Sequence, residues 1–475
     1  MKRRLGLSIC ALGLLAAALA PVAPASLSPE TRRTATQLRD RILAGSRAAD
    51  WVRDISDLAG PRLAGSPGDR AAIAVGLAIL KAQGFSNVRA EKAVVKVWQR
   101  GVEAGEVTSP ARQTLALTAL GGSIPTPEGG LEGEIVRAAS LEELAERAGA
   151  VRGRIAFIDQ PTARTSDGSG YGTAANVRSA GPSAAAKLGA IGFLMRSVGT
   201  GEGRLPHTGA TRYAEGVPPI PAAALSLDDA SLLTRLSRRG PVRVHFTLTC
   251  RTLPDAESAN VVGDIPGRET PGEIVLLGAH LDSWDLGTGA LDNAAGCGIV
   301  IEAARQIGAL PTRPRRTVRV VLFANEENGL AGGKAYAAAH ADELERHVVA
   351  LEADFGQGPP LGFGWLAGPA AEGALKTIAA LLAPIAAETL TPADGGGVDL
   401  IPLLPAGVPQ LGLSLDGTTY FDYHHTANDT FDRIDPRILD RSTAAAAVAA
   451  YVLAEMPDRM ERVPAAKRVL PAWIK

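Results

Sequence analysis

The stretch Val275-Leu276-Leu277-Gly278-Ala279-His280 is an apolar run that ends on a potential metal ligand. Three further apolar runs, at residues 318–323, 348–351 and 411–413, are also followed closely by polar residues that could bind a metal. Helical stretches separate the runs, and such alternation is typical of a mostly parallel sheet covered by helices. We therefore expect an α/β fold in which the four runs are strands.

A histidine or an acidic residue follows each expected strand after a short interval: His280; Glu326 and Glu327; Asp354; His424 and His425. The carboxyl ends of parallel strands meet at one edge of a sheet, so residues far apart in sequence converge there. Asp292 opens the segment Asp292-Asn293-Ala294-Ala295-Gly296, where a helix is expected to begin, and its carboxylate could face the same edge. The sequence therefore predicts a polar site at this edge.

The predicted site has the composition of a metal centre. Two imidazoles with three or four carboxylates and no nearby cysteine suit zinc, or else manganese or cobalt. This ligand set exceeds the need of one ion, and paired catalytic ions lie about 3.5 to 4 Å apart. In isolation His280 would be an ordinary loop residue, and Glu326 and Glu327 a solvated pair. The small residues Ala324 and Asn325 before the glutamates instead favour a turn at a strand end, where one glutamate binds metal and the other acts as a base.

These segments resemble the co-catalytic zinc exopeptidases of metallopeptidase family 28. The resemblance rests on the stretches Gly278-Ala279-His280-Leu281-Asp282-Ser283-Trp284-Asp285, Asp292-Asn293-Ala294-Ala295-Gly296, Asn325-Glu326-Glu327, Glu352-Ala353-Asp354 and His424-His425-Thr426-Ala427-Asn428-Asp429-Thr430. It extends through residues 193–198, 206–209 and 216–221. It implies His280 and Asp354 as ligands of one zinc ion. It implies Glu327 and His425 as ligands of a second ion and Asp292 as the bridge.

The same resemblance assigns further roles. It makes Glu326 the general base, and it makes Asp282 the residue that orients His280, as carboxylates commonly do for ligating imidazoles. It also implies a cis peptide bond between Asp292 and Asn293. The chain departs from the family at Asn293, where many relatives carry a second aspartate, and at residues 421–423, which bear on substrate preference.

The pair His424 and His425 offers two candidates for one ligand. His425 is preferred because the family's ligand stands four residues before the acid that is here Asp429. The neighbouring residues Asp416, Tyr420 and Asp422 are candidates to hold the ends of a peptide. Elsewhere, the segment of His207 is expected to approach the cleft, whereas His340 and His347 have acidic neighbours and are expected to be solvated.

Two domains are expected, because 475 residues exceed what one hydrophobic core usually organises. A Gly- and Pro-rich stretch at residues 121–130 and a turn-rich stretch at residues 253–258 mark the junctions. The segment between them contains expected strands at residues 153–158 and 192–195 and an expected helix at residues 182–188.

The family resemblance supplies the identity of these parts. Residues 122–255 correspond to an inserted protease-associated domain. Residues 26–121 and 256–475 form the zinc exopeptidase domain, whose implied fold is a mixed, mostly parallel sheet between helices.

The first 25 residues have the pattern of a secretory signal peptide: basic residues, an apolar run, and small residues at Ala23-Pro24-Ala25. We therefore expect an exported protein, periplasmic or secreted, with no stable membrane insertion after cleavage. Cys250 and Cys297 are too few for a disulfide scaffold, and either two thiols or one bridge fits the sequence. A formal net charge of -1 gives no footprint for nucleic acid or an anionic membrane. Small neutral or zwitterionic substrates fit better.

Together with the resemblance, the sequence favours a two-zinc exopeptidase acting on short peptides, above all free dipeptides. An aminopeptidase for longer chains is the alternative, because it would share the metal site and differ only in the walls of the cleft. An inactive binding module is disfavoured because every ligand and the base are present. A one-zinc glutaminyl cyclase is disfavoured because His280 and Asp354 are both retained. The expected partners are small peptides, and a homodimer is compatible with the sequence.

Overall fold

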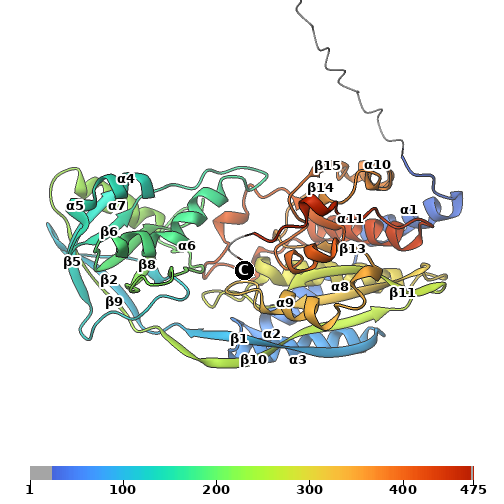
Figure 1. Cartoon of the computed structure of the whole chain (residues 1–475), viewed down its shortest axis with the longest axis horizontal. Helices are drawn as coiled ribbons and strands as arrows, with labels where there is room; N and C mark the ends of the chain where they lie inside the picture. Colours follow the sequence, from blue (N-terminus) through green and yellow to red (C-terminus); the bar gives the residue numbers. More distant parts are fainter. Residues whose placement is uncertain (1–23, 472–473, 475) are drawn as a thin grey trace, which may run out of the picture.

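The computed structural model describes residues 24–471 and residue 474, which form two lobes (Figure 1). Two long antiparallel strands, β1 (Ser86–Gln99) and β10 (Arg251–Ile265), run along one side of the molecule and connect the lobes. The expected signal peptide, residues 1–25, lies outside the described residues apart from Pro24 and Ala25. None of the described helices combines the length and apolar character needed to cross a membrane.

The first lobe is built on an eight-stranded mixed sheet in the order β1-β10-β12-β11-β13-β16-β14-β15. Its remaining strands are β11 (Thr270–His280), β12 (Arg316–Phe323), β13 (His347–Glu352), β14 (Pro360–Leu366), β15 (Thr389–Pro392) and β16 (Gln410–Leu415). The four strands predicted from the sequence are β11, β12, β13 and β16. They are neighbours in the sheet and run parallel, so the expected α/β fold with a mixed sheet is confirmed.

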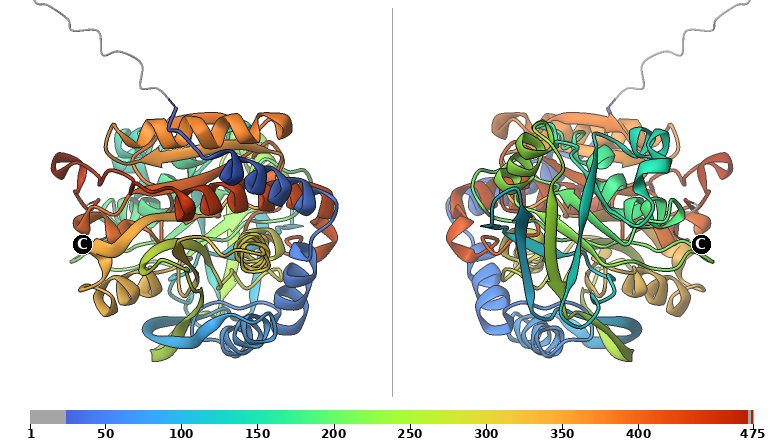
Figure 2. Two further views of the ribbon diagram at one scale, coloured as in Figure 1. Left: turned by 90° about the vertical axis from the view of Figure 1, so that its right-hand side faces the viewer. Right: turned by 90° about the vertical axis from the view of Figure 1, so that its left-hand side faces the viewer.

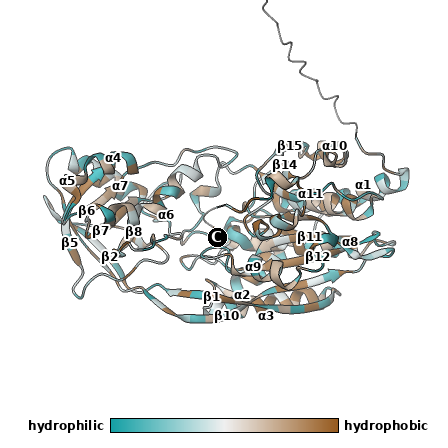
Figure 3. Ribbon diagram, in the orientation of Figure 1, coloured by the Kyte–Doolittle hydropathy of each residue, from teal (hydrophilic) through white to brown (hydrophobic). Residues whose placement is uncertain are grey.

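Helices cover both faces of this sheet. Successive side chains of a buried strand point to opposite faces, so each central strand contributes apolar residues to both layers. Val320 of β12 joins the apolar cluster under α8 (Ala295–Gly308) and α11 (Pro436–Glu455). The next residue, Val321, joins the cluster under α9 (Ala331–Ala339). Figure 2 shows α1 lying beside α11, and Figure 3 shows apolar residues concentrated on the central strands. The helices are α1 (Pro29–Leu43), α2 (Ala48–Ala59), α3 (Pro67–Ala82), α8 (Ala295–Gly308), α9 (Ala331–Ala339), α10 (Ala371–Leu382) and α11 (Pro436–Glu455).

The second lobe has its own eight-stranded sheet, in the order β3-β2-β9-β5-β6-β7-β8-β4. Its strands are β2 (Glu103–Ser109), β3 (Gln113–Thr114), β4 (Leu117–Ala119), β5 (Leu131–Ala138), β6 (Ile155–Ile158), β7 (Gly192–Arg196), β8 (Ala222–Leu225) and β9 (Arg243–Leu248). Its helices are α4 (Leu141–Glu146), α5 (Ala148–Val151), α6 (Tyr171–Lys187) and α7 (Leu227–Ser237). The expected helix at residues 182–188 is thus the end of a longer helix, and Pro182 lies inside it.

The second sheet begins earlier in the chain than residue 122. β2 pairs with β9 and β4 pairs with β8, so residues 103–119, which the sequence analysis placed with the catalytic part, belong to the second sheet. The chain therefore enters this lobe directly after β1 and returns directly before β10. The Gly- and Pro-rich stretch at residues 121–130 connects two strands of the lobe and is not a junction.

The expectation that His340 and His347 are solvated was wrong. His347 is the first residue of β13 and is fully buried, with its Nε2 2.8 Å from the hydroxyl of Tyr336. His340 ends α9 and lies 3.0 Å from the carboxylate of Glu91. Their acidic neighbours suggested a charged surface helix, but the chain turns there into a buried strand. Both described cysteines, Cys250 and Cys297, are buried free thiols, so the alternative of a bridge is excluded.

Candidate metal centre

The parallel strands place the predicted site residues at one edge of the first sheet. His280 is the last residue of β11, and Asp354 follows the end of β13 by two residues. Glu326 and Glu327 lie in the turn after β12, and His425 lies in the longer loop after β16. Because β12, β11, β13 and β16 are parallel neighbours, these loops converge as predicted.

Asp292 lies at the centre of the site, and its two oxygens face different histidines. Oδ1 is 3.1 Å from Nε2 of His280, and Oδ2 is 3.0 Å from Nε2 of His425. On the first side, Oδ1 of Asp354 lies 3.2 Å from the same nitrogen of His280. On the second side, Oε2 of Glu327 lies 3.1 Å from Nε2 of His425. The five residues thus form two groups that share Asp292.

The segment around Asp292 is fixed by hydrogen bonds to its backbone. The carboxylate of Asp429 accepts from the main-chain nitrogens of Leu291 and Asp292, at 2.6 and 3.0 Å. The amide of Asn293 donates to the main-chain oxygen of Ala353, at 2.9 Å, and so ties this segment to the loop of Asp354. The peptide bond between Asp292 and Asn293 is cis, as the resemblance implied.

His424 and His425 both approach Asp292, but they differ in their second contact. Nε2 of His424 lies 3.3 Å from Oδ2 of Asp292, and its buried Nδ1 has no hydrogen-bond partner among the residues that the structure describes. Nε2 of His425 is closer to Asp292 and also meets Glu327. The geometry therefore favours His425 as the ligand, and His424 stacks against its ring with a centroid distance of 3.5 Å.

Asp282 contacts both His280 and the glutamate turn. Nδ1 of His280 donates to the main-chain oxygen of Asp282 at 3.0 Å, while the carboxylate of Asp282 lies 3.7 Å from that nitrogen. The carboxylate instead accepts from the main-chain nitrogens of Glu326 and Glu327, at 3.0 and 3.3 Å. Asp282 thus holds the base candidate in place as well as the histidine, a role that the sequence did not reveal.

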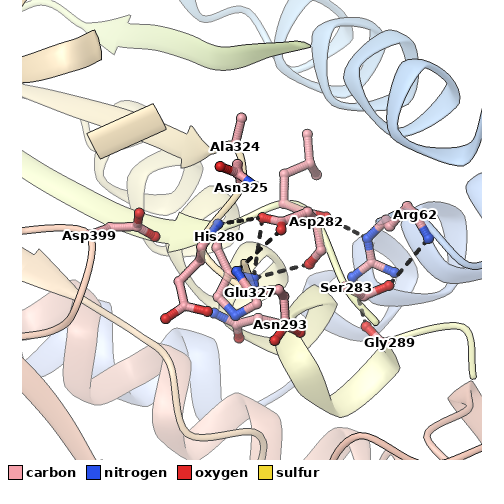
Figure 4. A network of polar contacts seen from close by, with 12 residues as sticks. Arg62, His280, Asp282, Ser283, Gly289, Asn293, Ala324, Asn325, Glu327 and Asp399 are labelled. Carbon is pink, nitrogen blue, oxygen red and sulfur yellow. Dashed lines mark hydrogen bonds and ion pairs between the residues drawn. The ribbon is translucent and has the colours of Figure 1, made fainter. Parts of the chain in front are cut away.

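Arg62 is a fully buried residue that the sequence analysis missed. Its guanidinium donates to the main-chain oxygens of Leu281, Thr288 and Gly289, at 2.5, 2.5 and 2.8 Å (Figure 4). These oxygens belong to the two ends of the loop that connects His280 to Asp292. Arg62 therefore fixes the spacing between two site residues. Its partners are backbone groups, which carry no sequence signature.

The second lobe contributes directly to the site through the segment of His207, as expected. The main-chain nitrogen of Thr208 donates to the main-chain oxygen of His425 at 3.0 Å. Nδ1 of His207 donates to the main-chain oxygen of His424 at 2.7 Å. Burial lowers the pKa of His207 to about 4, so its ring is neutral at ordinary pH. The histidine loop is therefore held between the two lobes.

Of the residues proposed to hold peptide ends, Asp422 and Asp416 already have partners. The carboxylate of Asp422 pairs with the guanidinium of Arg164 at 2.7 and 3.0 Å and accepts from the hydroxyl of Thr200 at 2.7 Å. Asp416 accepts from the main-chain nitrogen and the hydroxyl of Thr418. Asp422 thus links the two lobes, and its carboxylate is not free for a substrate.

The electrostatics of the site correspond to a cation-binding environment. Burial alone would lower the pKa of His280, but the carboxylates of Asp354, Asp282 and Asp292 raise it well above its usual value. Burial and nearby acids also raise the pKa of Asp399, a fully buried carboxyl behind the site (Figure 4). A divalent ion bound here would replace the proton on His280 and compensate the surrounding negative charge.

The donor set fits such an ion. His280, Asp292 and Asp354 form one group, and Asp292, His424 and His425 form another, in each of which one ligand atom per residue lies within 4.8 Å of the others. Imidazole and carboxylate donors without cysteine are the ligands of catalytic zinc. These residues would hold an ion that could polarise a carbonyl and activate water for hydrolysis.

Comparisons with known proteins agree with this chemistry. Residues 260–450 match the model of peptidase family M28. The chain is 36% identical to carboxypeptidase Q of Mus musculus over 88% of this chain and 87% of the relative. It is similar to the crystal structure of a peptidase M28 precursor from Shewanella amazonensis, with 43% identity and a TM-score of 0.89 over 92% of this chain and 99% of that one. A zinc aminopeptidase from Bacillus subtilis shares the fold at 20% identity, with a TM-score of 0.62 over 88% of this chain and 97% of that one. The chain belongs to peptidase family M28, and its buried histidines and carboxylates fit a metallopeptidase.

Proposed function

We propose that the centre binds two zinc ions that share Asp292, with His280 and Asp354 completing one site and Glu327 and His425 the other. The observation that carries this proposal is the placement of Asp292, whose two oxygens each face a different imidazole Nε2 at 3.0 to 3.1 Å. A carboxylate that offers one oxygen to each side can hold two ions together at the short separation of co-catalytic sites.

Glu326 is the proposed general base and acid. Two zinc ions would polarise the scissile carbonyl and lower the pKa of a water molecule. Burial raises the pKa of Glu326 well above its usual value, and Asp354 and Glu327 add to this shift while His280 opposes it. A carboxyl beside the metal centre can take a proton from the attacking water and pass it to the leaving amine. Asp282 supports this step by holding the main-chain nitrogen of Glu326.

We propose short peptides, and free dipeptides above all, as the substrates. The second lobe packs against the histidine loop through Thr208, beside the proposed metal site. A lobe on one side of the site limits the room for a long peptide and favours short substrates. The similarity to carboxypeptidase Q over most of both chains supports the same choice.

The decisive experiment compares kcat/KM for one free dipeptide, its N-acetyl form, its C-terminal amide and a pentapeptide with the same ends. A preference for the free dipeptide of about 100-fold or more is expected, because capping a charged end leaves buried partners unpaired. Cleavage of the amide and the pentapeptide, with rejection of the acetylated form, would instead identify an aminopeptidase. Hydrolysis of none of the four by the zinc-loaded protein would refute the proposal.

The second lobe is proposed to be the protease-associated domain of the family, and the protein is proposed to be exported. The first statement is supported by an independent sheet inserted between β1 and β10. The second is supported by the small residues that end at Ala25. N-terminal sequencing of protein recovered outside the cytoplasm should give Ser26 as the first residue. A chain that still begins at Met1 there would contradict cleavage.

A further inference from the structure

Arg178, on α6 of the second lobe, lies against the metal centre. Its Nη1 is 3.5 Å from Nδ1 of His425, and its guanidinium stands 5.4 Å from the centre of the Tyr171 ring. Tyr171 in turn stacks on Phe421 and meets the edge of His424, with centroid distances of 4.8 and 5.2 Å. A cationic side chain of the inserted lobe therefore forms part of the wall around the histidine loop.

The hydrogen bonds of this guanidinium are incomplete. Nη2 donates to the hydroxyl of Tyr171 at 2.7 Å, and Nη1 reaches the main-chain oxygen of Thr208 only at 3.5 Å. Nε is buried and has no partner among the described residues. Nη2 keeps a second hydrogen, so Nε and Nη2 can offer two donors to one acceptor group. A buried donor without a partner is costly, which indicates a partner that arrives with the substrate.

Arg178 also differs from the other enclosed arginines in having no carboxylate partner among the described residues. Other arginines with little exposed side chain form ion pairs, among them Arg39 with Asp40, Arg100 with Asp285, Arg196 with Asp159, Arg305 with Glu302, Arg316 with Glu273 and Arg319 with Asp264. Arg62 forms no ion pair within the described part of the chain but donates to three main-chain oxygens. None of the described carboxylates is thus paired directly with Arg178.

We propose that Arg178 binds the C-terminal carboxylate of the peptide substrate, an inference that rests on the proposed peptidase function. The planar guanidinium matches a carboxylate in a two-point contact. In a dipeptide, this carboxylate lies one residue beyond the scissile carbonyl, about 3.3 to 3.6 Å of extended chain. Arg178 lies against the imidazole of His425, one ring away from the metal proposed there, which places the guanidinium beside the proposed metal site.

The neighbouring backbone leaves room for this side chain. A Cβ at Gly209 would lie 2.4 Å from Cζ of Arg178, and the φ of +138° at this residue favours glycine. Arg178 and Tyr171 are seven residues apart on α6, which places them on the same face of the helix. The inserted lobe thus presents a positioned guanidinium with a hydroxyl beside it, and it thereby selects peptides with a free C-terminus.

Binding is tested in the Glu326→Gln background, where the peptide is not consumed, with zinc-loaded protein and calorimetric titration. Arg178→Met should weaken binding of the free dipeptide by about 100-fold and leave binding of its C-terminal amide within threefold. Arg178→Lys should give an intermediate loss, because the ammonium keeps the charge but not the planar fork. Arg238→Met, a change at an exposed arginine of the same lobe, is the matched control and should alter neither affinity.

Two further measurements keep the result interpretable. Zinc content is measured in every variant, because Arg178 lies against His425. Tyr171→Phe removes the hydroxyl that holds Nη2 of Arg178. This change should weaken binding of the free dipeptide by about tenfold without affecting binding of the amide. The Tyr171→Phe variant therefore provides the test if Arg178→Met does not fold. Equal weakening of dipeptide and amide, or unchanged binding of the dipeptide at full zinc content, would overturn the assignment of Arg178 while leaving the peptidase function intact. Wild-type protein that neither binds nor cleaves any peptide would refute the proposed function, and the assignment with it.

Discussion

Nδ1 of His425 donates a hydrogen bond to the main-chain oxygen of Thr208, 3.3 Å away in the other lobe. A proton on Nδ1 satisfies this oxygen and leaves Nε2 to bind a metal. The second lobe thus contacts the ring nitrogen opposite the proposed metal-binding nitrogen of a first-lobe histidine. Neighbouring contacts in the same segment should influence metal binding in a measurable way.

The first prediction concerns His207, whose ring donates to the main-chain oxygen of His424. His207→Ala should loosen the histidine loop and lower the affinity for the metal proposed at Glu327 and His425 by about 10- to 100-fold. This is the usual effect of removing a residue that supports a ligand. Titration against a competing chelator measures this affinity. His245→Ala changes another histidine of the second lobe, far from the site in the sheet, and should have no effect. Unchanged affinity in His207→Ala would contradict the prediction.

The second prediction tests the shared ligand. Asp292→Ala should lower the occupancy of both metal positions, because its two oxygens face both imidazoles. His280→Ala should mainly empty one position. The metal-to-protein ratio after gel filtration distinguishes the two variants. Loss of a single equivalent in both would show that Asp292 does not bridge.

The third prediction separates proton transfer from metal binding. Glu326→Gln keeps the shape of the side chain but cannot accept a proton, so turnover should fall by about 10²- to 10⁴-fold at full metal content. Glu327→Gln is the matched control, because this neighbour should lose metal as well as activity. A Glu326→Gln enzyme with more than a tenth of the wild-type rate would limit the contribution of the base to about 1.4 kcal/mol and remove Glu326 from this role.

The fourth prediction concerns acid stability. Burial lowers the pKa of His347 to about 4, below the value of about 6.5 expected in the unfolded chain. As the pH falls from about 6.5 to 4, the unfolded state binds the proton first, so this residue makes the free energy of unfolding fall by on the order of 3 kcal/mol. Urea unfolding between pH 4.5 and 8 should show a smaller decrease in His347→Gln than in the wild type. If the free energies of unfolding of the two proteins differed by the same amount at every pH, this role of His347 would be excluded.

The sequence predicted the central part of the fold because periodicity and polar strand ends both reflect the parallel sheet. β12, β11, β13 and β16 follow from short apolar runs, and the residues after them converge since parallel strands end at one edge. The hydrogen-bond partners were not predictable. Arg62 and Thr208 act through main-chain oxygens, which any residue can supply, so no residue type signals them.

Burial was predicted less well than strand position. The acids around His347 suggested a solvated helix, yet the residue begins a buried strand whose neighbours in space are far away in sequence. The extent of the second lobe was misplaced for a similar reason. β2 and β4 find their partners more than a hundred residues later, in β9 and β8, and composition does not reveal such pairing.

The ribbon of β1 and β10 has a consequence for how this architecture could arise. Gln99 and Arg251, where the chain leaves and re-enters the first sheet, are direct partners in the register of the ribbon. A short hairpin turn could join them without moving any other strand, so a gene segment inserted at one point would add the whole second lobe. The reverse event is not neutral, because deleting that segment would leave Nδ1 of His425 without the oxygen of Thr208. Removing the lobe would therefore disturb the metal site even though the ribbon could close without it.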